Sequence, residues 1–246
     1  MAVILDNKAA HLKRYEQFAA GHDARTAAFK MVGGGDEERV GFTEMALLDK
    51  YVPLTGRRHL IDVGCGPGRL ARYLTDRKEL SYLGTDVVPQ LLEVARVECA
   101  RPDWEFKEVT GFTIPTADGI ADAVAIFSVF TNIFPEHSAL LTKEAARVLK
   151  PGGRLLISYM DLGHERHQHT FRDLMQHWER RIDPLVFLDE TFLRFFAANA
   201  GLDIVEFVAP TTQQCDDIPG AKLLDGREVS GPIGLGQTLC LMEKRG

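Results

Sequence analysis

The feature that most constrains this chain is a glycine-rich turn after a short apolar segment. Residues 60–63 read Leu-Ile-Asp-Val, and Gly64, Gly66 and Gly68 then alternate with Cys65 and a proline. An apolar run before glycines is typical of a buried strand that ends in a turn. Without side chains at the glycines, the backbone can approach a nucleotide-like ligand, and a helix after the turn adds unpaired amides. The spacing GxGxG is not the GxGxxG of dinucleotide sites, which disfavours a nicotinamide dehydrogenase.

Strand and helix patterns alternate through the middle of the chain. Apolar runs predict five strands, at residues 60–63, 81–86, 104–107, 122–127 and 154–159. Helical patterns lie between them at residues 70–77, 89–100 and 136–149. Such alternation indicates an α/β fold with a doubly wound, mostly parallel sheet. Two later strands, at 202–208 and 238–242, suit an antiparallel hairpin at the sheet edge, and Asp189 and Gly201 begin and end the helix before them.

The segments outside the alternating region differ in character. Residues 1–56 read as helices with breaks, and we expect them to form an N-terminal helical cover. Residues 57–246 are expected to form the ligand-binding domain. Within it, residues 161–188 are polar and rich in histidine, which suggests a lid insertion over the ligand site.

Composition and charge exclude several classes of protein. The net charge of the 246 residues is −6, whereas a duplex-binding protein needs a basic face, so we expect no nucleic-acid partner. No apolar run is long enough for a membrane span or a signal-peptide core, so we expect no membrane partner and a cytoplasmic location. The four cysteines form no CxxC pair and are expected to be free thiols. These features leave the oligomeric state open.

Asp86 is the second candidate ligand residue. It ends the predicted strand at 81–86, and ligands of parallel α/β sheets bind at the carboxyl ends of strands. A carboxylate there can accept hydrogen bonds from both hydroxyls of a ribose. The alternative is that Asp86 caps the helix that begins near Pro89. We favour ribose binding because Asp86 occurs together with the glycine turn.

Residues 60–160 resemble the core of the class I methyltransferases that depend on S-adenosylmethionine (SAM), especially the small-molecule subgroup. Four segments in the family's order carry the resemblance: residues 60–68 resemble the first motif, 84–86 the ribose motif, 122–132 the fourth-strand motif, and 145–153 the helix and turn before the fifth strand. The resemblance implies a Rossmann-like, mostly parallel seven-stranded sheet with SAM as cofactor and S-adenosylhomocysteine as product.

The resemblance also implies roles for individual residues. Asp62 and the backbone around Gly64, Cys65 and Gly66 would hold the methionine part of SAM. Asp86 would hold the ribose, and the residues near the adenine would be Val87, Thr110, Gly111 and Phe112. Thr110 departs from the pattern, since many relatives carry Asp there, and main-chain groups of the next two residues are expected to compensate. Phe127 and Ser128 would line the reaction centre.

Aromatic and histidine side chains are the remaining candidates. Tyr15 could face the sulfonium, since an aromatic face attracts a cation, or could simply lie on the buried face of its helix. His137 is the candidate catalytic base, with a surface position in a first helical turn as the alternative. The cluster His164, His167 and His169 could bind a metal, but we interpret it as part of a polar loop and predict no metal site.

The sequence therefore predicts an enzyme that transfers a methyl group from SAM to a small-molecule acceptor, with oxygen as the favoured atom. Methylation of nitrogen or carbon on the same fold is one alternative. A second is a SAM-binding subunit without turnover. An Asn/Asp-Pro-Pro-Tyr sequence after the fourth strand would indicate methylation of adenine or glutamine amino groups, and Phe-Ser-Val-Phe stands there at residues 127–130.

Overall fold

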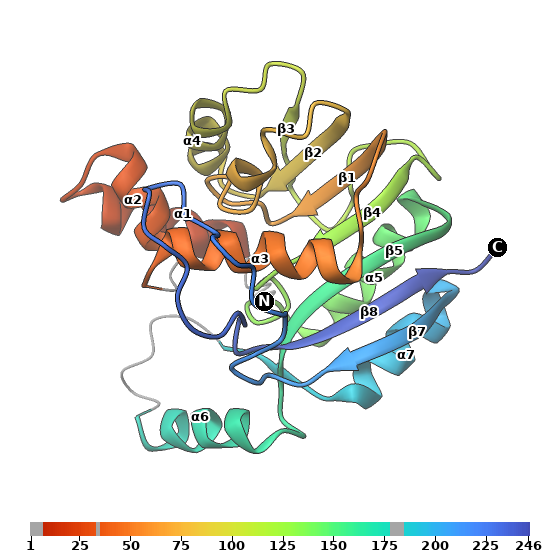
Figure 1. The fold of residues 1–246 in the computed structure, drawn as a ribbon. Coiled ribbons are helices and arrows are strands. Elements are labelled where there is room, and N and C mark those ends of the chain that lie inside the picture. The colour runs from red at the N-terminus through yellow and green to blue at the C-terminus, as the bar shows by residue number, and fades with distance from the viewer. Residues whose placement is uncertain (1–6, 33–34, 178–184) are drawn as a thin grey trace.

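A computed structural model describes residues 7–32, 35–177 and 185–246 of the chain. Figure 1 shows a twisted sheet with helices packed against both faces. The strands are β1 (Arg58–Val63), β2 (Leu80–Asp86), β3 (Glu105–Glu108), β4 (Ala121–Ile126), β5 (Leu149–Asp161), β6 (Phe187–Leu188), β7 (Leu202–Val208) and β8 (Thr238–Lys244). The helices are α1 (Asn7–Ala19), α2 (Ala24–Val32), α3 (Glu37–Tyr51), α4 (Pro89–Cys99), α5 (Pro135–Val148), α6 (Glu165–Gln176) and α7 (Glu190–Ala200), with a 3₁₀ helix η1 (Ala71–Leu74).

The strand order confirms the predicted fold class. The order is β3-β2-β1-β4-β5-β8-β7, and the first five strands of this path are parallel. β8 runs antiparallel to both β5 and β7, which is the predicted edge hairpin. The short strand β6, which the sequence did not predict, pairs with the end of β5 as an eighth strand. The chain order reverses between β1 and β4, so a ligand crevice is expected at their carboxyl ends.

Each face of the sheet has its own apolar core. On one face, side chains of α3, η1 and α4 pack against alternate sheet residues such as Leu60 and Tyr82. On the other, α5 and α7 pack against their neighbours, for example Ile61 and Leu83. Neighbouring residues of one strand belong to different cores because successive side chains of a strand point to opposite faces of the sheet. Figure 1 shows the same division of the helices.

Local sequence signals mark several helix boundaries. Asp189 begins α7, where its side chain accepts hydrogen bonds from the amides of Thr191 and Phe192, and Gly201 ends it with a left-handed φ of 72°. Both boundaries are as predicted. Asp36 caps α3 in the same way, through the amide of Arg39. These caps satisfy amides that have no partner inside the helix.

The predicted helix over residues 70–77 is wrong in type. After the glycine turn the chain makes further turns and only four residues of 3₁₀ helix, η1. Gly68 has a φ of +84°, which no right-handed helix allows, and the carbonyl of Arg69 presses against Gly41 of α3, where a Cβ would lie 2.5 Å away. The close packing of this segment on α3 and the left-handed glycine together leave a short, tight helix.

The flanking segments contain the expected helices. α1, α2 and α3 lie within residues 1–56, and α1 and α2 pack around Tyr15, Phe29 and Leu91 of α4. The proposed lid at 161–188 contains α6 and β6, while its residues 178–184 lie outside the described part of the chain, as do Gly33 and Gly34. Within the described ranges, the helices are too short or too polar to span a membrane.

Candidate functional site

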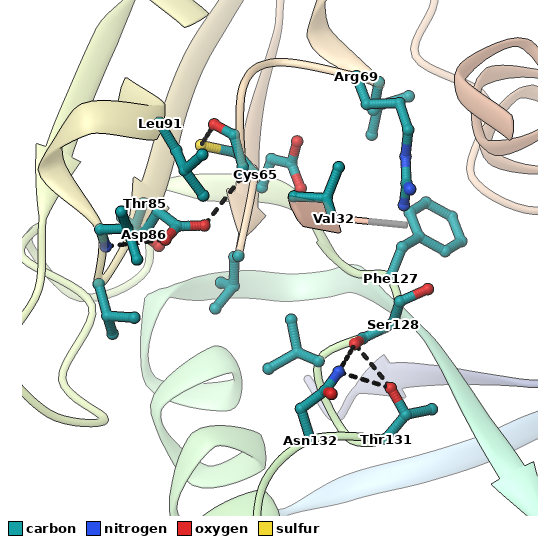
Figure 2. A pocket seen from close by; sticks show the side chains of 18 of the residues that line it. Val32, Cys65, Arg69, Thr85, Asp86, Leu91, Phe127, Ser128, Thr131 and Asn132 are labelled. Carbon is teal, nitrogen blue, oxygen red and sulfur yellow. Dashed lines mark hydrogen bonds between the residues drawn. The ribbon is translucent and has the colours of Figure 1, made fainter. Parts of the chain in front are cut away.

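A cavity of about 490 Å³ lies at the carboxyl ends of β1, β2 and β4. Its walls come from the glycine turn, the ends of these strands and helices α1–α3. Residues 109, 111–114, 127–129, 131–133, 234, 235 and 237 also belong to them. The volume is in the range of pockets that hold cofactor-sized ligands. Figure 2 shows Asp86 and Arg69 on opposite sides of this cavity, with Val32 between them.

The glycine turn is shaped by close contacts as well as by backbone conformation. Gly64 and Gly66 have φ values of +73° and +55°. A Cβ at Gly64 would lie 2.4 Å from Cγ2 of Val129, and one at Gly66 would lie 3.2 Å from Cγ1 of Val32. Glycine is needed at both places because the backbone is left-handed and the cavity wall is near.

The amides of the turn are engaged within the protein. The amides of Gly64 and Cys65 donate to the carbonyl of Thr85, at 2.7 and 3.0 Å. The amide of Gly66 donates to Oδ2 of Asp86, at 3.0 Å. The sequence suggested this backbone as a holder of the ligand's methionine part, whereas the structure shows that its amides fasten the turn to the end of β2.

Asp86 is half-buried at the edge of the cavity. Its second oxygen, Oδ1, accepts a hydrogen bond from the amide of Val88 at 2.9 Å. Burial raises the pKa of Asp86. α4 begins after Val88 and has no side-chain cap, so the helix-capping alternative does not describe this contact. Each carboxylate oxygen keeps a lone pair that can accept a hydrogen bond from a ligand hydroxyl.

Asp62, at the end of β1, is only 3% exposed. Its carboxyl accepts a hydrogen bond from the hydroxyl of Tyr82 at 2.7 Å. Burial raises the pKa of Asp62 to about 7, although the bond from Tyr82 opposes the shift. Asp62 can therefore change its protonation state near neutral pH when a charged ligand group approaches.

A buried ion pair, which sequence reasoning missed, forms part of the same wall. Arg69 donates through Nε to Oε2 of Glu44 at 3.1 Å and through Nη2 to Oε1. Glu44 lies on α3, and burial raises its pKa. The two residues are 25 positions apart, so no local motif joins them. The one available signal was a glutamate within the apolar stretch Phe42–Leu48.

Ser128 follows β4 on the other side of the cavity. Its φ of +59° is uncommon for a residue that is not glycine. The amide of Ser128 donates to Oγ of Ser158 at 2.8 Å, and its Oγ accepts from Nε2 of Gln237 at 3.0 Å. Its carbonyl accepts from Thr131 and Asn132, at 2.8 and 2.7 Å (Figure 2). These bonds hold a strained backbone at the predicted reaction centre, and strain of this kind collects at functional sites. Gln237 was also missed, because it is 109 residues away.

Most of the predicted cofactor residues border the cavity. They are Asp62, Gly64, Cys65, Gly66, Asp86, Val87, Gly111, Phe112, Phe127 and Ser128. Tyr15 and Thr110 do not line it: Tyr15 is buried among the apolar side chains of α1, α2 and α4.

His137 lies in the first turn of α5 and also does not line the cavity. Its ring stacks on Phe112, with the centroids 4.3 Å apart, and Phe112 does face the cavity. Its Nδ1 is buried without a hydrogen-bond partner. The imidazole is thus separated from the cavity by one aromatic ring.

The histidine cluster has local structural contacts. His164 caps α6 by accepting from the amide of Arg166 at 3.2 Å. His167 is buried, accepts from the amide of Asp161 at 2.7 Å and reaches the carbonyl of Gly236 at 2.9 Å. His169 is exposed, and its Nε2 lies 3.7 Å from Oε1 of Glu165 one turn earlier on α6. The described residues contain no group of three side chains arranged for a metal ion.

Comparisons with known proteins found similarity to methyltransferases. The family described as "Methyltransferase domain" matches residues 61–157. A demethylmenaquinone methyltransferase of Tropheryma whipplei is 32% identical over 108 residues, which are 44% of each chain. An O-methyltransferase of Pyrenophora dematioidea is 24% identical over 196 residues, 77% of this chain and 70% of that one. The match thus spans less than half the length of the Tropheryma protein.

A solved structure is similar over a larger part of the chain. It is a SAM-dependent methyltransferase of Methanosarcina mazei, with a TM-score of 0.57 over 81% of this chain and 97% of that one. The two sequences are 16% identical, so this likeness concerns the fold.

Proposed function

We propose that the protein is a class I SAM-dependent methyltransferase that transfers a methyl group from SAM to a small-molecule acceptor, with oxygen as the favoured atom. The match of residues 61–157 to the family described as "Methyltransferase domain" and the similar fold of a solved methyltransferase support this proposal. One observation carries the proposal. The cavity lies at the carboxyl ends of β1 and β4, where the chain order reverses, and its wall combines the glycine turn with the half-buried carboxylate of Asp86. Such a wall suits a ligand that carries a ribose.

The residues present fit SAM. Asp86 has lone pairs left for the ribose hydroxyls, and Val87, Val88 and Leu91 offer an apolar surface for the adenine beside it. Phe127 and Ser128 border the opposite part of the cavity, where the sulfur would lie. A side chain at Gly66 would fill the space between the turn and Val32.

SAM supplies a methyl group on a positively charged sulfur, which is already an activated leaving group. The protein therefore has to position an acceptor in line with that group and to exclude water. Ser128 is well placed for this task, because hydrogen bonds with four side chains hold its amide, carbonyl and hydroxyl. An oxygen acceptor also needs a base for its proton. His137 can take that role only if Phe112 turns aside, because the two rings are stacked.

We propose that the N-terminal helical cover selects the acceptor, whereas no described residue of the predicted lid at 161–188 lines this cavity. Val32, Val40 and Leu235 give the acceptor side apolar surface, and Thr43, Asn132 and Gln237 add neutral hydrogen-bonding groups. Such a lining suits a small molecule with an apolar body and a hydroxyl group. The likeness to the Pyrenophora O-methyltransferase supports oxygen as the acceptor atom.

Calorimetric titration with SAM, S-adenosylhomocysteine and NAD tests the donor. We expect the first two to bind and NAD not to bind, and the proposal fails if neither SAM nor S-adenosylhomocysteine binds at millimolar concentration. Incubation with SAM and a panel of phenols, amines and carbon acids then tests the acceptor atom by mass spectrometry. Binding without any turnover across the panel would favour a SAM-binding subunit instead.

A further inference from the structure

The glycine turn has no free amide for the carboxylate at the amino-acid end of SAM. This end carries a carboxylate and an ammonium, and a carboxylate taken out of water needs hydrogen-bond donors. The amides of Gly64, Cys65 and Gly66 are already engaged with β2 and its end. Pro67 has no amide hydrogen, and the amide of Gly68 donates to the carbonyl of Cys65 at 3.1 Å. The turn at 64–68 therefore offers no spare amide to a carboxylate, and a side chain has to supply the donor.

Four basic side chains line the cavity, at His11, Arg14, Arg39 and Arg69. His11 and Arg14 share one face of α1, and His11 lies near enough to Asp86 to influence its pKa, so this pair belongs to the ribose end. The guanidinium of Arg39 donates hydrogen bonds to the carbonyls of residues 230–232, at 2.6 to 3.2 Å, and so already has partners within the protein.

Arg69 is the remaining cation, and its surroundings suit the methionine end. It directly follows the turn, and Figure 2 shows its side chain reaching toward Phe127, where the sulfur would lie. Its charge also acts on the buried carboxyl of Asp62. The Arg69 side chain is 11% exposed, so a ligand group that meets it is largely removed from water.

The ion pair with Glu44 orients the guanidinium. Glu44 is bound by the Nε and Nη2 edge, which leaves Nη1 and the second hydrogen of Nη2 for another planar anion. We propose that this edge of Arg69 binds the carboxylate of SAM, and that Glu44 is the positioning residue that aims it. The inference rests on the proposed function, since it concerns the same ligand.

The simpler interpretation is that the pair only joins α3 to the turn. A buried ion pair adds little net stability compared with apolar side chains of similar size, because desolvation offsets the attraction. Its position in the cavity wall is better explained by a charged ligand. The ammonium of the same ligand would lie near Asp62 and Glu44, whose pKa values are both raised by burial.

Two ligands separate the interpretations. S-Adenosylhomocysteine carries the amino-acid end, whereas 5′-methylthioadenosine has the same nucleoside and sulfur without it. Both are titrated by calorimetry into wild type, Arg69→Gln, Glu44→Gln and the paired variant Glu44→Met with Arg69→Met, which leaves no buried charge without a partner. Arg39→Gln is the matched control, because it removes the same charge from the same cavity. Thermal melting verifies that each protein is folded.

We expect Arg69→Gln and the paired variant to lose about 10- to 100-fold in affinity for S-adenosylhomocysteine, with methylthioadenosine within about twofold of wild type. Glu44→Gln should show a smaller loss of the same selectivity, and Arg39→Gln should show none. Equal loss of both ligands, or unchanged binding of S-adenosylhomocysteine, would overturn the assignment of Arg69. A wild type that binds methylthioadenosine and S-adenosylhomocysteine equally would overturn it too, while a wild type that binds neither would contradict the proposed function itself.

Discussion

The two walls of the cavity are built in different ways. The donor wall consists of the turn at 64–68 and the end of β2, so its parts lie close together in the sequence and are joined by backbone bonds to Thr85 and by Asp86. The acceptor wall joins residues 39–43 of α3 to residues 128–132 and 234–237, and Gln237 reaches Ser128 across 109 residues. A wall made from one strand–turn–strand unit is specified locally, whereas a wall made from distant segments depends on the complete fold.

The bonds that hold the two walls differ as well. The acceptor wall continues into the loop over residues 209–237, which is fastened to α3 by Arg39, by an ion pair between Arg227 and Asp36, and by a bond from Tyr51 to Gln214. Arg227 and Asp36 are about half exposed, while Asp62 and Cys65 of the donor wall are buried. We therefore expect substitutions in the donor wall to have the larger effects.

Gly64→Ala should break the donor wall most severely. The new Cβ would meet Val129 at 2.4 Å in a left-handed backbone, so we expect the free energy of unfolding to fall by about 2–4 kcal/mol in urea denaturation. Gly56→Ala is the control, because its φ is +72° and nothing lies within 4 Å of the new Cβ. Equal losses for the two variants would show that the contact with Val129 has no influence.

Asp86→Ala should weaken SAM binding by about 1–3 kcal/mol in calorimetry, because charge-assisted bonds to the ribose are lost. Asp122→Ala serves as the comparison. Asp122 stands at the opposite end of the sheet, where it accepts from the amide of His59 and from Lys150, so SAM affinity should not change. Unchanged affinity in Asp86→Ala would leave Asp86 with a purely structural role in fastening Gly66.

Asp62→Asn should change the free energy of unfolding by an amount that depends on pH, because burial of the ionised Asp62 carboxylate destabilises the folded protein. The pKa of Asp62 is raised from 3.8 to about 7, so the folded protein resists ionisation that the unfolded chain permits. The penalty is absent below pH 3.8, grows as the pH rises and is complete above about pH 7. Asparagine keeps an acceptor for Tyr82, so the variant should be more stable than wild type by about 1–3 kcal/mol at pH 8 and equal to it at pH 4. A difference that is the same at both pH values would contradict the assignment.

Arg227→Ala should loosen the acceptor wall with the smallest effect. The guanidinium of Arg227 lowers the pKa of Asp36 to about 2, so the pair stabilises the fold above the ordinary value of 3.8 and ceases to do so as the pH falls through 2. Because both partners are exposed to solvent, we expect a loss of about 0.2–1 kcal/mol at pH 7 that declines in high salt. An NMR titration should show a higher pKa for the Asp36 carboxyl in the variant than in wild type, and equal pKa values in the two proteins would show that the pair is absent in solution.

The difference between the walls also separates the features that the sequence predicted from those that it did not. The glycine turn, Asp86 at a strand end, the alternation of strands and helices and the boundaries of α7 were predictable, because each depends on neighbours within one strand–turn–helix unit. The helix after the turn was mistaken for an α-helix, because its shape depends on Gly41 of a distant helix. Glu44 and Gln237 could not be found for the same reason.

By itself, the sequence determined the class of the fold and most of the residues that line one side of the cavity. Periodic burial specifies the strands, and glycines and a carboxylate at strand ends specify the turn, and all of these act over a few residues. Only the tertiary structure decided which groups of the turn are free to bind a ligand and which side chains stand beside it. The amides of the turn donate hydrogen bonds to Thr85 and Asp86, because the parallel pairing of β1 and β2 places these two residues beside the turn. In our proposal, the charge that meets the carboxylate of the ligand comes from Arg69, which Glu44 of α3 orients.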